Sequence, residues 1–214
     1  LEEFIVFNEP LATDALVKIN NQNLHAMGAV TLLIVTDDEL RTAAQRLADH
    51  RTSYAGIETR VVTVNEIFNE FSGGRPDVVA IRDVARYLKQ RYPQTFKHLL
   101  LFGKGTYDYK NVLPNNSNRV LTYESRNSVS PLETYSSDDF FGLLEDSEGE
   151  WRECFSCNET LDIGVGRLPI KQPDQAQYIV DKIIDYETRQ SLRGSWQTKI
   201  AFVADDGDFN VHQA

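Results

Sequence analysis

Short apolar runs alternate with amphipathic stretches along this chain, and that alternation restricts its fold more than any other feature. The run TLLIVT at 31–36 is followed by DDELRTAAQRLADH at 37–50. In the second segment, apolar residues recur at the spacing of one helix face: Leu40, Ala43, Ala44, Leu47 and Ala48. Strands that alternate with helices form parallel sheets with right-handed crossovers. The sequence therefore predicts an α/β fold with a parallel sheet flanked by helices.

The same pattern continues along the chain. ETRVVTV at 58–64 and KHLLLFG at 97–103 predict buried strands, and PDVVAIRDVARYLKQRY at 76–92 predicts a helix capped by Asp77. Thr36 and Glu39 have capping-box spacing before the first helix. Later, LDIGVGRLP at 161–169 predicts a strand, QPDQAQYIVDKIIDYETR at 172–189 a helix, and TKIAFVA at 198–204 another buried strand.

Between Tyr107 and about Cys157 the periodicity is lost, and Asn, Ser, Asp and Pro accumulate. A long irregular segment inside a compact domain is usually a functional loop or a seam between subdomains. We therefore expect a first α/β subdomain at 1–105. Residues 106–214 would then hold the connecting loop and the start of a second α/β subdomain that is incomplete.

The charge balance limits the classes of partner. A formal net charge of -10 and a pI near 4.9 oppose binding to nucleic acids and to anionic membranes. No stretch approaches the roughly 18 uninterrupted apolar residues of a membrane span. Proteins, peptides and cations remain the expected partners.

The turn GKG at 103–105 follows a predicted strand, which is where a dinucleotide-binding fingerprint begins. The fingerprint needs a third Gly where this chain has Asp108, and no helix is predicted next to receive a pyrophosphate. A nucleotide-binding domain is therefore a minor alternative. The simpler interpretation is that Gly103 and Gly105 let the strand turn sharply at the carboxyl edge of the sheet.

Cysteine and histidine residues give no complete catalytic pattern. Cys154 and Cys157 form a lone C-x-x-C without a second ligand pair, which favours incidental thiols or a local disulfide over a zinc site. None of the four histidines lies in a recognisable nucleophile motif.

Acidic residues form two candidate sites. Asp206, Asp208 and Asn210 have the alternate spacing of the first half of a calcium loop, although a solvated acidic loop explains them equally well. Asp138 and Asp139 adjoin Phe-Phe-Gly, and adjacent carboxylates on an extended chain point in different directions. One of the two could face a pocket and attract a basic substrate group, whereas an Asx-type turn is the simpler explanation.

Several stretches taken in order resemble the gingipain-type cysteine peptidases, which have a caspase-like fold, and among them the signal peptidases of type IX secretion systems. They span Asn20 to His212 and are NQNLHAM, RLADHR, NEIFNEFSGGRPDVVAIRDVARYLK, HLLLFGKGTYDYKN, LTYES, SSDDFFGLL, LDIGVGRLP and VADDGDFNVH. The resemblance implies two α/β subdomains and a secreted or cell-envelope location. The resemblance also implies that the protein requires no cofactor and that a bound calcium ion would have only a structural role.

The resemblance also implies roles for individual residues. Asp138 matches the Ser-Asp that supplies an acidic base to the S1 pocket, with Asp139 beside it, and Glu124 is a weaker match to the acid that orients the catalytic histidine. Where the family commonly has Gly-Asp-Gly, this chain has Lys104. The catalytic His-Gly and the nucleophilic Cys of such peptidases are expected after the closing acidic loop.

The chain is therefore expected to be the N-terminal part of the catalytic region of a cysteine endopeptidase that processes proteins exported by a type IX secretion system. Without a thiolate and its paired base, it would be inactive alone. The main alternative is an inactive homologue that acts as an interaction module in the secretion machinery.

Overall fold

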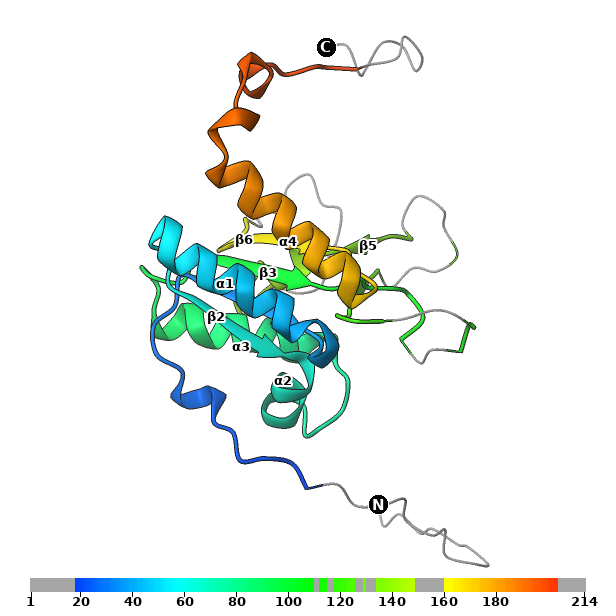
Figure 1. Ribbon diagram of the computed structural model, residues 1–214. Coiled ribbons are helices and arrows are strands. Elements are labelled where there is room, and N and C mark those ends of the chain that lie inside the picture. The colour runs from blue at the N-terminus through cyan, green and yellow to red at the C-terminus, as the bar shows by residue number, and fades with distance from the viewer. Residues whose placement is uncertain are drawn as a thin grey trace, which may run out of the picture.

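A four-stranded parallel sheet lies at the centre of the molecule (Figure 1). The computed structural model describes residues 18–109, 112–114, 118–125, 129, 134–148 and 160–203. The strands are β1 (Leu32–Thr36), β2 (Thr59–Thr63), β3 (His98–Phe102) and β6 (Gly164–Leu168), in the order β2-β1-β3-β6. A separate antiparallel pair joins β4 (Tyr123–Glu124) to β5 (Ser136–Ser137). The predicted α/β fold with a parallel sheet flanked by helices is confirmed.

Helices cover both faces of this sheet. They are α1 (Arg41–Ala55), α2 (Val64–Phe71), α3 (Val78–Arg91) and α4 (Pro173–Thr188). Short 3-10 turns are η1 (Leu24–Ala26), η2 (Asp38–Leu40), η3 (Asp139–Phe141), η4 (Gln190–Leu192) and η5 (Ser195–Thr198). In the described ranges, no helix is both long and apolar enough to cross a membrane.

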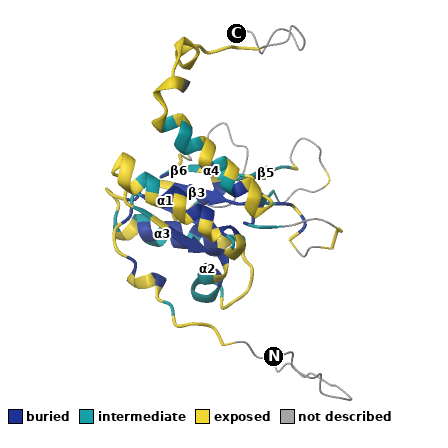
Figure 2. Cartoon of the chain, in the orientation of Figure 1, coloured by how far each residue is buried: buried dark blue, intermediate teal, exposed yellow. Residues whose placement is uncertain are grey.

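Successive side chains of each strand enter different cores. Leu33 and Val35 of β1 pack with α2, α3 and η3, whereas Leu32 and Ile34 pack with α1 and α4. Because adjacent strand residues point to opposite faces, a strand covered on both sides must be apolar throughout. Figure 2 shows the resulting layer of buried residues between the helices.

Local sequence signals place the helices. The predicted stripe of α1 is buried along its length, and the Asp77 side chain accepts the Val79 N–H at the start of α3, as predicted. The capping box, however, lies at Thr63 and Glu66, before a helix that the sequence analysis did not identify. The Thr36 hydroxyl instead donates to the carbonyl of Phe102 on the neighbouring strand β3.

The strand after the long irregular segment belongs to the same sheet as the strands before it. β6 pairs with β3 in parallel, and α4 packs against α1 over the same core. The expected boundary at residue 105 therefore does not divide the sheet. Residues on both sides of this boundary contribute strands to one sheet, and the division into subdomains at 105 and 106 stays a prediction.

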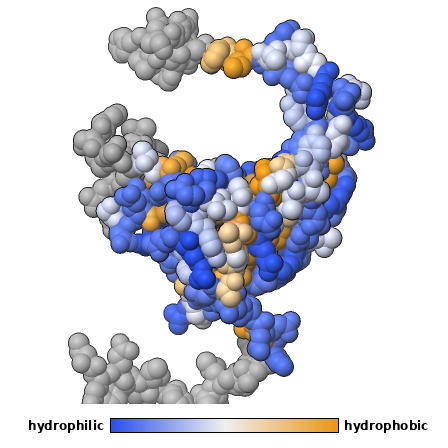
Figure 3. Space-filling view, turned by 90° about the vertical axis from the view of Figure 1, so that its left-hand side faces the viewer, coloured by the Kyte–Doolittle hydropathy of each residue, from blue (hydrophilic) through white to orange (hydrophobic). Residues whose placement is uncertain are grey.

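The prediction of a buried strand at 198–204 is wrong for residues 198–203, which the structure describes. They are in η5 and an extended coil, and the side chains of Ile200, Phe202 and Val203 are 79%, 90% and 97% exposed. Figure 3 shows apolar surface at the C-terminal end of the described residues. An alternating apolar pattern forms a strand only when a neighbouring strand takes its hydrogen bonds, and none of the described strands does so here.

Glu187 of α4 connects this helix to α1. Its carboxylate pairs with Arg51 and lies 2.7 Å from Nε2 of the mostly buried His50. Burial raises the pKa of Glu187, but the hydrogen bonds from Arg51 and His50 outweigh it, so the pKa is below the ordinary 4.5. The ionised form is therefore the one that the fold stabilises.

We expect the melting temperature to fall as the pH drops below about 4.5, because a depressed pKa stabilises the folded state only while Glu187 is ionised. Glu187→Gln should flatten this part of the profile in thermal melts. Asp185→Asn is the matched control, since Asp185 forms an exposed pair on the same helix. Equal slopes for Glu187→Gln and the wild type would contradict the assignment.

Candidate functional site

The carboxyl ends of the strands meet at one edge of the sheet. Thr36 is in register with Thr63 on one side and with Phe102 on the other, and Phe102 is in register with Leu168. Segments that follow these strands, together with the β4–β5 hairpin, lie over this edge at the right of Figure 1. In parallel α/β sheets this edge is where sites are built.

Arg167 forms the centre of this edge. Its Nε and Nη2 donate to the two carboxylate oxygens of Asp138, each at 2.8 Å. Its side chain is 12% exposed and that of Asp138 26%. Such a two-point contact between a guanidinium and a carboxylate fixes both groups in direction and in distance. Asp138 therefore lies at this edge with its charge paired inside the chain, and its predicted contact with substrate stays a prediction.

The same guanidinium also holds three backbone carbonyls. Nη1 donates to Gly103 O at 2.8 Å and to Val120 O at 2.9 Å, while Nη2 donates to Leu121 O at 2.9 Å. These partners belong to the end of β3 and to the segment before β4. The Arg167 side chain thus joins three segments: the end of β3, residues 120–121, and the loop at 136–139 that carries Asp138, which is called the aspartate loop below.

Two buried aromatic residues directly after Asp139 anchor the aspartate loop in the core. Phe141 is fully buried, and Phe140 stacks on Tyr123 with ring centroids 4.5 Å apart. The Arg82 guanidinium also lies over Phe140, 5.5 Å from the ring centroid. Because both rings are in the core, the chain just before them is held at the sheet edge.

A small pocket opens beside the Asp138–Arg167 pair. Its volume is about 160 Å³, and its lining comprises Gly105, Thr122, Ser136, Ser137, Asp138, Arg167 and Pro169. The glycine turn after β3 and the aspartate loop therefore line one common pocket. A volume below the roughly 300 Å³ of typical small-molecule sites suits a single side chain better than a nucleotide.

Glu124 lies on the hairpin next to this pocket. Partial burial raises its pKa, and no group among the described residues donates a hydrogen bond to its carboxylate. Burial and the nearby negative charge of Glu124 raise the pKa of Tyr109 to about 12. The Tyr109 hydroxyl donates to the Thr122 carbonyl, which leaves the Glu124 carboxylate available to another group.

The remaining predicted site residues are placed differently. Asp139 is exposed at the start of η3, and its N–H donates to Ser137 Oγ at 3.2 Å. Asp206, Asp208 and Asn210, like Cys154 and Cys157, lie outside the described residues. Within the described part of the chain, no group of three or more His, Cys, Asp or Glu side chains could hold a metal ion.

The Gly-Lys-Gly turn serves packing. The N–H groups of Gly103 and Lys104 donate to Leu168 O at 2.9 Å and Ile170 O at 2.8 Å, so neither is free to bind a phosphate. A Cβ added to Gly103 would lie 2.8 Å from the Arg119 Cβ. The turn thus needs glycine because the 119–122 segment passes directly against it.

We expect Gly103→Ala to lower the free energy of unfolding by about 1–3 kcal/mol, because the added methyl overlaps Arg119 and Val120. Urea denaturation would measure the loss. Gly166→Ala is the matched control, because a Cβ there meets nothing within 4 Å. Equal stabilities for the two variants would show that the turn tolerates a side chain.

The model of one protein family, described as peptidase family C25, matches residues 25–214, nearly the whole chain. The chain belongs to peptidase family C25. Its resemblance to the gingipain-type cysteine peptidases is therefore confirmed at the level of the family.

A solved structure agrees with this C25 assignment. The chain is 32% identical in sequence to the protein in the crystal structure of dimeric latent PorU from Porphyromonas gingivalis, with a TM-score of 0.71. The match covers 85% of this chain but 18% of that protein. No curated protein matches the chain.

Sequence analysis of this C25 chain missed Arg167, the residue that organises the site. A signal was present, because an arginine stands near the carboxyl end of the predicted strand, between the apolar residues of GVGRLP. A charge near the end of a buried strand usually needs a partner at the sheet edge. Arg119 was missed in the same way. Its guanidinium forms ion pairs with Asp37 and Glu39, which follow β1, and so connects the 119–122 segment to the end of that strand.

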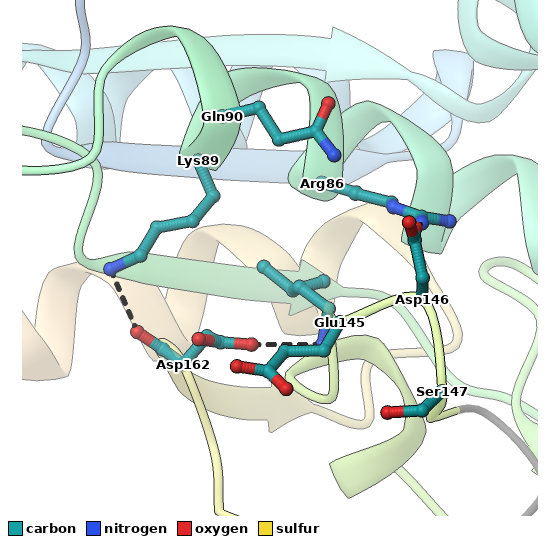
Figure 4. Close-up of a pocket in the computed structure, with 8 residues that line it drawn as sticks. Arg86, Lys89, Gln90, Glu145, Asp146, Ser147 and Asp162 are labelled. Carbon is teal, nitrogen blue, oxygen red and sulfur yellow. Dashed lines mark hydrogen bonds and ion pairs between the residues drawn. The ribbon is translucent and has the colours of Figure 1, made fainter.

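A second hollow, of about 450 Å³, lies between α3 and the 144–147 turn. Two of its basic side chains have partners there: Arg86 pairs with Asp146, and Lys89 Nζ donates to the Asp162 carbonyl at 3.0 Å (Figure 4). The Asp162 carboxylate accepts the Leu144 N–H at 3.0 Å. These contacts fix the turn against α3, so this hollow has a structural role.

Proposed function

We propose that this chain is the N-terminal part of the catalytic region of a gingipain-like cysteine endopeptidase that processes proteins exported by a type IX secretion system. The observation that carries the proposal is the 32% identity to PorU over 85% of the chain. The pocket at the carboxyl edge of the sheet supports it, because parallel α/β sheets build their sites at this edge and Asp138 lines the pocket.

The proposed roles follow from position at this edge. Asp138 and Asp139 line the cleft that receives the substrate, one within the pocket and one exposed beside it. Glu124 orients the catalytic histidine, because a half-buried carboxylate with no recorded hydrogen bond can still accept an imidazole N–H. The histidine and the nucleophilic cysteine are supplied by the part of the peptidase beyond these residues.

The proposed partners are exported proteins and the components of the secretion system. The proposed location is the bacterial cell envelope or surface, where such substrates emerge. A function as an interaction module without catalysis predicts the same partners, so only an activity measurement separates the two functions.

The test uses the full-length protein that contains this chain. It should cleave the signal region from an exported precursor, and alkylation of thiols should abolish the cleavage. The chain alone should show no cleavage. If the full-length protein binds precursor or secretion components but never cleaves, the interaction module is the correct function.

A structural calcium ion bound by Asp206, Asp208 and Asn210 is a separate part of the proposal. Excess Ca²⁺ should raise the melting temperature of the full-length protein, and a chelator should lower it, because a ligand that binds only the folded state stabilises it. An Asp208→Asn variant should respond less. Identical melting curves with Ca²⁺ and with chelator would contradict the site.

A further inference from the structure

All five N–H groups of the Arg167 guanidinium are used within the described chain. Nε and Nη2 donate to the two oxygens of Asp138, each at 2.8 Å. The other three N–H groups donate to the carbonyls of Gly103, Val120 and Leu121. A guanidinium has five donors and no acceptor, so none is left for a substrate. Arg167 can therefore act on a reaction only through its charge or through the residues that it holds.

The partners of Arg167 lie at the base of the β4–β5 hairpin. Leu121 is two residues before β4, and Asp138 directly follows β5. Glu124 of β4 is in register with Ser136 of β5. Because the backbones of two antiparallel strands hold each other in register, a side chain that fixes both strands at their base also fixes the place of Glu124.

The Glu124 side chain lies on the outer face of this hairpin. Successive residues of a strand point to opposite faces. The neighbouring Tyr123 is buried and stacks on Phe140, with ring centroids 4.5 Å apart. Glu124 therefore points away from the core, where a group from another part of the protein can meet it.

The positive charge of Arg167 is not what acts on Glu124. Arg167 and Asp138 form an ion pair that is neutral as a unit. Burial raises the pKa of Glu124, whereas a positive charge that acted on this carboxylate would lower it. The connection between Arg167 and Glu124 therefore runs through the backbone of the hairpin.

We propose that Arg167 is a positioning residue of the peptidase, which holds the β4–β5 hairpin on the end of β3 so that Glu124 can orient the catalytic histidine. This inference rests on the proposed function, which gives Glu124 that role. Arg167 then affects the rate through Glu124 and does not touch the substrate itself.

The test is a double-mutant cycle in the full-length peptidase, with Arg167→Gln, Glu124→Gln and the double variant. Arg167→Gln alone should lower kcat by about tenfold or more, because a small displacement of a catalytic group is costly. KM should stay within about twofold, because Arg167 makes no contact with substrate. In the Glu124→Gln background the same change should lower kcat by less than about twofold. An equal loss in both backgrounds would overturn the inference, because a purely structural arginine acts independently of Glu124.

Arg167→Lys keeps the cycle decisive if Arg167→Gln does not fold. Lysine retains the positive charge beside Asp138, but its ammonium has three donors and lacks the planar fork that reaches the carbonyls and the carboxylate together. We expect the same pattern of kcat losses as for Arg167→Gln. Wild-type kcat in a folded Arg167→Lys enzyme would contradict the positioning role.

Arg46→Gln is the matched control. Arg46 pairs with Asp181 on the surface between α1 and α4, away from the hairpin. This variant makes the same chemical change and should leave kcat unaltered in both backgrounds. Circular dichroism melts of all the variants would set a temperature at which each is folded.

Hydrogen exchange tests the hairpin without any activity. The Ser125 N–H donates to the Tyr135 carbonyl at 3.0 Å, next to Glu124. In Arg167→Gln this amide should exchange about tenfold faster or more, measured relative to the amides of β1, and in Arg46→Gln it should not change. Unchanged exchange in Arg167→Gln would overturn the inference alone. A wild-type peptidase that cleaves no precursor would contradict the proposed function, and the inference with it.

Discussion

Replacing Arg167 by methionine is expected to lower the free energy of unfolding by about 3 kcal/mol or more. The change leaves the partly buried Asp138 carboxylate without its counter-ion, and removal of one member of such a pair costs about 3–5 kcal/mol. It also leaves the carbonyls of Gly103, Val120 and Leu121 without this donor. Chemical denaturation followed by circular dichroism would measure the loss.

The double variant Arg167→Met, Asp138→Leu should recover part of that loss, because it removes the unpaired charge as well. Arg46→Met is the control for the loss of an exposed arginine and should cost less than about 1 kcal/mol. If Arg167→Met proves as mild as Arg46→Met, the guanidinium does not hold the sheet edge together.

Replacing Glu124 by glutamine in the full-length peptidase should lower kcat by about a hundredfold or more without a loss of stability. An acid that orients a catalytic histidine fixes its tautomer and stabilises its charged form, and the amide does neither. Burial raises the pKa of Glu124, which means that the fold disfavours the ionised carboxylate. Glutamine removes that charge, so the melting temperature at neutral pH should stay level or rise.

The raised pKa also fixes the sign of a pH effect. The folded state binds the Glu124 proton more tightly than the unfolded state does, so this group stabilises the fold at low pH and loses that contribution as the pH rises through its raised pKa. Glu124→Gln should therefore show its largest relative gain in melting temperature at neutral pH. Glu124→Asp, which keeps the charge, tests position separately. If Glu124→Gln proves less stable than the wild type but fully active, Glu124 has a structural role only.

The helices α1, α3 and α4 and the inner strands could be predicted from the sequence because their signals are local, whereas the short α2 was missed. The stripe from Leu40 to Ala48 marks the buried face of α1 and Asp77 caps α3, whatever the rest of the chain does. The placement of β6 is different. LDIGVGRLP predicts a strand, but its partner β3 lies about sixty residues earlier, and a local pattern does not name its partner.

The same difference between local and distant signals applies to the residues around Asp138. Phe140 and Phe141 indicate a buried anchor, so the position of Asp138 at an edge could be expected from neighbouring residues. The state of its carboxylate depends on Arg167, which is distant in sequence and contacts Asp138 only once β6 has joined the sheet. The alternating residues at 198–204 likewise indicate a strand, but the described part of the chain holds no partner for them.

The long segment that leaves β3 and returns at β6 links two strands that lie side by side. Because its two ends are fixed by the sheet, its length can change at little entropic cost to folding. Evolution can therefore lengthen, shorten or rewrite this segment while β3 and β6 stay paired. Related peptidases built on this sheet can consequently diverge in what they recognise much faster than in how they fold.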